Sequence, residues 1–204
     1  MFSSARRLLG TISAGCAISA AVVLASSVSA AQANLVDLGT CNSATLSQPF
    51  APWGDSASYE LAPGGDFENS DLATSPWTLS NGAQLVAGSE PYAATGKLGL
   101  SSLSLPAGSS AQSPSTCVDA AYPTARLFVG GTGSLALSVV YDGVAIPTGL
   151  VVASGSWTPS PVMITAGPVF GLLSGGTAQV SIQLTGLTGS PQVDDVFIDP
   201  WGRG

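Results

Sequence analysis

The chain has 204 residues, no histidine, and 12 acidic against 5 basic residues, which gives a formal net charge of −7. Binding to nucleic-acid phosphates needs a basic face, and binding to anionic lipid needs clustered Lys and Arg, so this composition excludes both functions. The lack of histidine removes the commonest general base, the usual serine triad and most zinc sites.

The first 33 residues predict a secretory signal peptide. Arg6 and Arg7 form a short basic start, and an uncharged run of small and apolar residues follows over 8–24. Small residues then offer cleavage sites after Ala30 or Ala33. An uncleaved membrane anchor is the alternative, and the Ala, Ser and Gly residues within the run disfavour it. We therefore expect a secreted, extracellular protein that does not insert into a membrane after processing.

Residues 34–62 are less regular, and we interpret them as an N-terminal extension that packs on the domain that follows. Cys41 lies in this segment, and Cys117 lies far beyond it in the sequence. Two cysteines that remain in an oxidising compartment most simply form one disulfide, which would attach the extension to the region around Cys117. A metal-binding or catalytic thiol is the alternative, but each would lack its usual histidine companion.

Several segments between 63 and 204 have the period of a β-strand. Residues 98–105 contain two apolar pairs whose alternation slips at Ser101-Ser102, which predicts a β-bulge. Residues 134–141 alternate apolar and polar side chains and end at the turn pair Asp142-Gly143, which predicts a hairpin. Residues 177–185 alternate in the same way.

Glycine and proline interrupt the mature chain at short intervals, and no segment after the signal peptide keeps a helical period. Many short strands separated by such turn residues are typical of a sandwich or a barrel. We therefore predict an all-β fold, an antiparallel β-sandwich of the jelly-roll type, as a single domain over residues 63–204.

Three short segments carry a resemblance to a known family. GGDFE followed by SPWTLSNGAQLV resembles the opening strand of carbohydrate-binding-module jelly rolls, which have a galactose-binding-like fold. SLSLPAGSSAQSPSTCV resembles the middle of the same domains, and QVDDVFIDPW resembles their final strand. The pattern is also similar to a group of uncharacterised secreted actinobacterial proteins. The resemblance implies a jelly roll whose first and last strands run side by side.

The same resemblance implies a structural calcium ion held between those two strands. Its ligands would be carboxylates and nearby backbone carbonyls: Glu68, Asp194, and Gly65 or Asp66. Calcium prefers six to eight hard oxygen ligands, and two carboxylates held together are unfavourable unless a cation or a proton lies between them. The register of the last strand leaves Asp195 and Asp199 open as alternatives to Asp194. The other interpretation is that these acids are solvated residues at turns and strand ends.

Sugar binding needs exposed aromatic rings beside polar groups, because pyranose rings stack on them. Trp53, Tyr92 and Trp157 lie in segments rich in proline and glycine, and they are the candidate ligand-binding residues. A structural role is the alternative for each. Trp77 begins a predicted strand and Tyr141 continues an apolar face, so both are predicted to lie in the core.

Three functions follow as hypotheses. The first is a secreted, non-catalytic module that binds glycan or cell-wall material, with a structural calcium site. The second is a secreted structural or surface-interaction protein with no small ligand. The third is a two-carboxylate glycosidase, which needs only a paired acid and base. Its candidate acids are Glu60, Glu68, Glu90, Asp119 and the Asp cluster at the end of the chain. None lies in a recognisable catalytic context, so we expect no enzyme activity.

Overall fold

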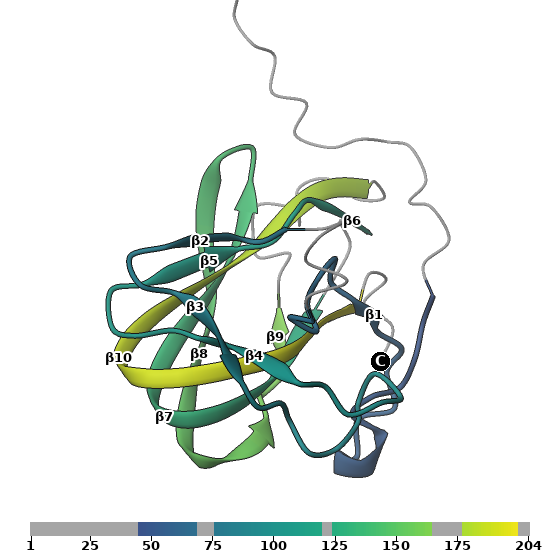
Figure 1. Ribbon diagram of the computed structural model, residues 1–204. Coiled ribbons are helices and arrows are strands. Elements are labelled where there is room, and N and C mark those ends of the chain that lie inside the picture. The colour runs from purple at the N-terminus through teal and green to yellow at the C-terminus, as the bar shows by residue number, and fades with distance from the viewer. Residues whose placement is uncertain (1–44, 69–75, 120–123, 165–176, 200–204) are drawn as a thin grey trace, which may run out of the picture. The chain divides into compact units, whose positions relative to one another are not determined.

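The computed structural model describes residues 45–68, 76–119, 124–164 and 177–199, which all belong to the compact unit Ala33–Gly204. In chain order the elements are η1 (Ala51–Trp53), β1 (Glu60–Leu61), β2 (Thr78–Ser80), β3 (Gln84–Ala87), β4 (Ser101–Ser104), β5 (Ser110–Gln112), β6 (Thr116–Asp119), β7 (Thr124–Tyr141), β8 (Val144–Pro159), β9 (Met163–Ile164) and β10 (Thr177–Asp199) (Figure 1). All strand pairs among the described residues are antiparallel. The prediction of an all-β antiparallel jelly roll is confirmed.

The predicted signal peptide and Cys41 lie outside the described residues. The Cys41–Cys117 disulfide therefore stays a prediction, with Cys117 on β6. Within the described part of the chain, no helix is long and apolar enough to span a membrane.

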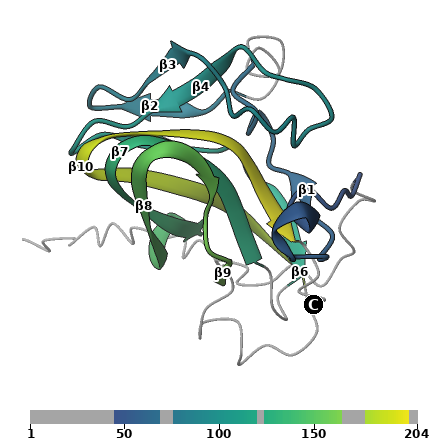
Figure 2. The same ribbon diagram turned by 90° about the horizontal axis from the view of Figure 1, so that it is seen from below.

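The long strand β10 lies at the centre of the sheet. One of its edges pairs with β7 over most of its length, and the other pairs first with β5 and β6, then with β4 and β1. Beyond these, β2 extends the sheet from β5 and β3 extends it from β4. Figure 2 shows how β7, β8 and β10 curl, with β2, β3 and β4 lying together on one side of them. One strand therefore links the two halves of the sandwich.

The hairpin between β7 and β8 forms as the sequence predicts. Tyr141 pairs with Val144, and the two residues between them have positive φ angles, 48° at Asp142 and 78° at Gly143. Two such residues make the hairpin turn whose twist matches that of the strands it joins. The alternating segment within β10 is also confirmed, because its apolar side chains are buried while its polar side chains are more exposed.

The long strands bend where glycines let two backbones approach closely. At Gly133, with φ 122°, a β-carbon would collide with the backbone carbonyl of Thr188 on β10. The ladder between β7 and β10 shifts register close by, between Gly186 and Thr188. Only a residue without a side chain fits this contact, so the bend is a property of the sequence.

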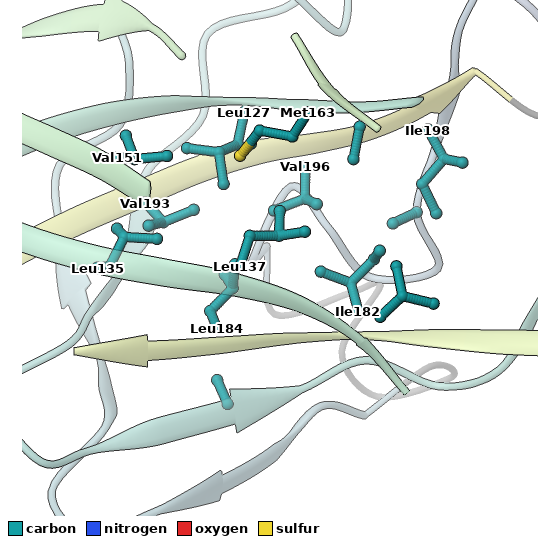
Figure 3. Packing of buried hydrophobic residues seen from close by; sticks show 14 of the residues in the cluster. Leu127, Leu135, Leu137, Val151, Met163, Ile182, Leu184, Val193, Val196 and Ile198 are labelled. Carbon is teal, nitrogen blue, oxygen red and sulfur yellow. The ribbon is translucent and has the colours of Figure 1, made fainter. Parts of the chain in front are cut away.

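One hydrophobic core collects side chains from both halves of the sheet. Figure 3 shows apolar residues of β7, β8, β9 and β10 pointing toward one another: Leu127, Leu135, Leu137, Val151, Met163, Ile182, Leu184, Val193, Val196 and Ile198. Trp77 and Tyr141 belong to the same core, as the sequence predicts. The indole Nε1 of Trp77 donates a hydrogen bond to the carbonyl of Pro63 (2.9 Å), which satisfies the buried donor.

A second, smaller cluster lies on the opposite face of β7 and β10, because neighbouring residues of a strand point to opposite sides. Phe128 of β7 and Phe197 of β10 pack there against Phe50 and Tyr59. The last two residues come from the part of the predicted N-terminal extension that the structure describes. This part of the sheet is therefore covered on both faces.

A partly buried ion pair adds to the contact between residues 45–62 and the sheet. Arg126 Nη1 donates to Asp55 Oδ2 at 2.7 Å, and the guanidinium lies 4.2 Å from the ring centroid of Phe50. The carbonyl of Ser160 accepts from both Nε and Nη2 of the same arginine. Asp55 and Ser160 thus accept hydrogen bonds from three nitrogens of the buried Arg126 guanidinium.

Two sequence predictions are wrong in detail. The predicted bulge at Ser101 is absent, because β4 begins at this residue and pairs with β3 without a register shift. The phase slip instead marks the strand boundary, since Leu98 and Leu100 precede the strand and are exposed. Trp157 was expected in a loop but lies within β8, which continues to Pro159.

Replacing Leu184 with alanine should destabilise the fold strongly. Its side chain is buried opposite Leu137, and removing a buried leucine side chain costs about 2–5 kcal/mol. The exposed Gln179, on the same strand, is the matched control, and its change to alanine should alter the free energy of unfolding by under about 0.5 kcal/mol. Denaturant unfolding measures both variants. Equal losses would contradict the assignment of Leu184 to the core.

Candidate functional site

The opening and closing segments of the domain lie side by side. In the ladder of β1 and β10, Glu60 pairs with Ile198. Beyond β1, the amide of Ala62 donates to the carbonyl of Val196 (2.8 Å), and the amide of Val196 donates to the carbonyl of Gly65 (3.0 Å). The adjacency that the resemblance implies is confirmed, and it places the GGDFE segment directly against the VDDVF segment.

A β-bulge in β10 presents two acids at this junction. Asp194 pairs with Phe128 and Phe197 pairs with Arg126, so β10 has one more residue than β7 over this stretch. Asp195 takes up the extra length with a φ of 48°, an unusual backbone conformation for a residue other than glycine. Bulges re-aim side chains, and here both aspartates are buried, at 1% and 4% exposure.

Four buried acids from three separate segments interact at the bulge. We name them the acidic cluster: Asp66, Glu90, Asp194 and Asp195. The amide of Glu90 donates to Asp194 Oδ2 (2.9 Å), and the amide of Asp195 donates to Asp194 Oδ1 (3.0 Å). The charge of Glu90 is also one of the causes that raise the pKa of Asp195, so the two side chains interact.

Burial and like charge raise the pKa of both bulge aspartates. Burial is the larger cause for Asp194 and, with the charge of Glu90, outweighs the hydrogen bonds that favour its carboxylate, so its pKa rises to about 7. The pKa of Asp195 is also raised, first by burial and then by the charges of Asp194, Glu90 and Asp66. Carboxyl groups crowded in this way favour either a proton or a cation between them.

Glu68 is the metal ligand that the resemblance implies from the GGDFE segment, and its hydrogen bonds show where its side chain lies. Its Oε1 atom accepts hydrogen bonds from the amides of Leu100 (2.6 Å) and Ser101 (3.0 Å), where β4 begins. Its own amide donates to Asp66 Oδ1 (3.2 Å), which connects Glu68 to the acidic cluster through the backbone. In the described ranges, no three acidic or cysteine side chains form a ready-made metal-ligand set.

The three candidate ligand-binding aromatics come together in space. The rings of Trp53 and Tyr92 are 4.8 Å apart between centroids and lie at 80° to each other. The hydroxyl of Tyr92 donates to the carbonyl of Trp157 (2.7 Å). Trp53 is 39% exposed and Tyr92 is 44% exposed, while Trp157 is partly buried. We call these three residues the aromatic surface.

Buried rings support the aromatic surface from below. Phe128 is fully buried, and its ring centroid lies 5.4 Å from that of Trp53 and 5.6 Å from that of Tyr92. The ring of Phe50, the residue that precedes η1, stacks on the ring of Phe128, with 5.2 Å between the centroids. The indole of Trp157 lies against Gly130, where a β-carbon would sit 2.7 Å from the indole Cδ2. A side chain at this glycine would displace the indole.

The candidate acids of a glycosidase differ in burial, and Glu60 and Glu68 are partly exposed. Among them, Glu90 and the bulge aspartates are buried. Glu60 lies on β1, where Thr116 Oγ1 donates to its Oε1 (3.1 Å) and burial raises its pKa. Asp119 ends β6. A glycosidase must bring a general acid to the sugar oxygen in solvent, and the buried carboxyls cannot do so in this conformation.

Sequence reasoning considered Glu90 only as a catalytic acid and missed its place in the acidic cluster. It lies between β3 and β4 in the segment SEPY, which has no strand period that could predict its partners. Phe128 was also missed as the support of the aromatic surface. Its apolar neighbours on β7 gave a signal for burial but none for which face it would occupy.

Comparisons with known proteins give likenesses of fold only. No protein-family model and no curated protein matches the sequence. Similar solved structures include the C-terminal CBM6 of LamC from Zobellia galactanivorans, which is 16% identical, with a TM-score of 0.39 over 61% of this chain and 93% of that one. A CBM22-1–GH10 xylanase fragment from Clostridium thermocellum is 18% identical, with a TM-score of 0.44 over 61% of this chain and 26% of that one.

A third similar structure is the enzymatically active domain of tailspike protein 4 from bacteriophage CBA120, which is 14% identical with a TM-score of 0.39. The match covers 67% of this chain but only 20% of the tailspike chain. At these identities and TM-scores, the comparisons give no information on the ligand or the activity of this protein.

The metal-free protein should lose stability as the pH rises from about 4 to 8. In the folded state Asp194 holds its proton up to about pH 7, whereas the unfolded chain releases it near pH 4, so folding binds a proton in this range. The stabilisation is complete below about pH 4 and is lost as the pH passes about 7. Thermal unfolding in EDTA across this range measures the effect.

The change Asp195→Asn should flatten this pH dependence, because it removes a second carboxyl group whose pKa folding raises. The matched control is Asp142→Asn, which makes the same charge change in the exposed β7–β8 turn and should keep the slope of the wild type. A stability that rises between pH 5 and 8 in EDTA would contradict the raised pKa of Asp194.

Proposed function

We propose that this chain is a secreted, non-catalytic module that binds glycan or cell-wall material. The observation that carries the proposal is the pair of exposed rings, Trp53 and Tyr92, held at 80° on a base of buried aromatic side chains. Sugar rings stack on such faces, and a corner of two rings lets one sugar stack on one ring and meet the other. Secretion is supported by the predicted signal peptide over residues 1–33.

The rigid base favours tight stacking, and the charge of the chain limits the class of glycan that is expected to bind. Because Phe128 and Phe50 hold the rings from below, binding costs little side-chain conformational entropy. The net charge of −7 disfavours polyanionic glycans, so neutral glycans are the expected ligands.

Glycan-array binding followed by calorimetry tests this function. Trp53→Ala and Tyr92→Ala should each weaken binding about tenfold or more, because each removes a ring that contacts the sugar. Leu150→Ala is the control, since it removes an exposed apolar side chain from β8 and should leave the affinity unchanged. A folded protein that binds no glycan on the array would reject this function in favour of a surface-interaction role.

We also propose a structural calcium ion at the acidic cluster. The chemistry of the donors fits, because four buried carboxyl groups crowd one another and calcium prefers oxygen ligands. Asp194, Asp195, Glu90 and Asp66 would hold the ion, together with backbone carbonyls of the GGDFE segment. Glu68 stays a candidate ligand, because the amides of Leu100 and Ser101 both bond to the same one of its oxygens. The ion would replace the proton that the cluster otherwise retains.

Calcium should raise the melting temperature at pH 8, and EDTA should reverse the rise, because an ion that binds only the folded state stabilises it. The rise should shrink in Asp195→Asn and persist in the control Asp142→Asn. A melting temperature that is the same in calcium and in EDTA at pH 8 would remove the calcium site from the proposal.

A further inference from the structure

The segment that carries Tyr92 lies between β3 and β4 and contains no strand. Its exposed ring must nevertheless hold one position if it is to meet a sugar. The hydroxyl of Tyr92 bonds to the carbonyl of Trp157, but that contact fixes only the tip of the side chain. The position of the backbone must be set by other contacts.

Those contacts come from the side chain of Glu90. Its Oε2 accepts a hydrogen bond from the amide of Tyr92, and its Oε1 accepts one from the amide of Ala94 (2.8 Å). Both bonds are made by one carboxyl group that is 1% exposed. The backbone on either side of Ala93, which has a φ of 54°, is therefore folded around this side chain.

Glu90 is in turn held by β10. Its amide donates a hydrogen bond to Asp194 Oδ2 (2.9 Å), and both atoms are buried. A continuous chain of hydrogen bonds therefore runs from the bulge in β10, through Glu90, to Tyr92 and on to Trp157. The acidic cluster and the aromatic surface are connected through this one residue.

The side chain of glutamate suits this role better than that of glutamine or aspartate. Glutamine has one acceptor oxygen, and its NH₂ group would face the second amide donor. Aspartate is one methylene shorter and would not reach both amides. Burying Glu90 beside two aspartates costs free energy of folding. The two amide hydrogen bonds that its carboxyl group accepts account for its presence there.

We propose that Glu90 is the positioning residue of the aromatic surface, and that its carboxyl group holds the backbone at Tyr92 and Ala94 in the conformation that binds ligand. The part of this inference that concerns affinity rests on the proposed glycan function. The part that concerns the backbone does not, because it is read in the protein without ligand.

Amide hydrogen exchange tests the backbone part. In the wild type, the amides of Tyr92 and Ala94 should be protected. In Glu90→Gln, their exchange should rise about tenfold or more, while the amide of Ile182 in the core keeps its protection. Glu60→Gln makes the same chemical change on β1 and should leave exchange at Tyr92 and Ala94 unchanged. Unprotected Tyr92 and Ala94 amides in the wild type would overturn the inference even if the Glu90 variant failed to fold.

A double-mutant cycle tests the affinity part. Glu90→Gln should weaken glycan binding about tenfold, and the double variant with Tyr92→Ala should bind no more weakly than Tyr92→Ala alone, because Glu90 acts through Tyr92. A folded Glu90→Gln variant with wild-type affinity and wild-type exchange would overturn the inference. If the losses of binding free energy in Glu90→Gln and Tyr92→Ala added up in the double variant, the inference would also be overturned. A wild type that binds no glycan would reject the proposed function, and the exchange experiment would then decide the role of Glu90 by itself.

Discussion

The extra residue in β10 between Asp194 and Phe197 sets the positions of both side-chain clusters. A regular ladder would continue the strict alternation of buried faces, and Asp195 and Val196 would then exchange sides of the sheet. The bulge instead keeps Val196 in the main core and leaves both aspartates buried beside the GGDFE segment. Asp194 also pairs with Phe128, whose ring supports Trp53 and Tyr92. The Asp194–Phe128 pair of the β7–β10 ladder therefore belongs to the acidic cluster on one strand and supports the aromatic surface on the other.

The fold tolerates this arrangement because the surrounding ladder is long. β7 and β10 stay paired on both sides of the bulge, and apolar side chains fill the core along both strands. Burial of this apolar surface is the main favourable term in folding, and it offsets the desolvation of a few carboxyl groups. The crowded acids then make the stability of the domain depend on what neutralises them. A proton does so at low pH, and the proposed calcium ion would do so at neutral pH.

The acidic cluster and the aromatic surface are held in position by different contacts. The acidic cluster needs groups from three distant segments, and backbone hydrogen bonds to β10 hold them. The aromatic surface needs rings that stay exposed without collapsing onto the core, and the buried Phe128 and Phe50 provide the floor beneath them. Arg126 contributes to the same floor through Asp55 and the ring of Phe50. Residues beneath the aromatic surface therefore determine the positions of its exposed rings.

The sequence by itself determined the fold class, because a period of two, a hairpin turn at Asp142-Gly143 and the alternation in β10 are local signals. It also marked Trp53, Tyr92, Trp157 and the aspartates as candidates, since their residue types and neighbours are visible without coordinates. Only the tertiary structure decided which candidates meet. Glu90 joins Asp194 across more than a hundred residues, and Trp53, Tyr92 and Trp157 converge from three segments. The bulge predicted at Ser101-Ser102 is absent, whereas β10 has register shifts between Gly186 and Thr188 and at Asp195 that the sequence did not predict. Register and bulges depend on pairing between distant strands, and no local pattern records that pairing.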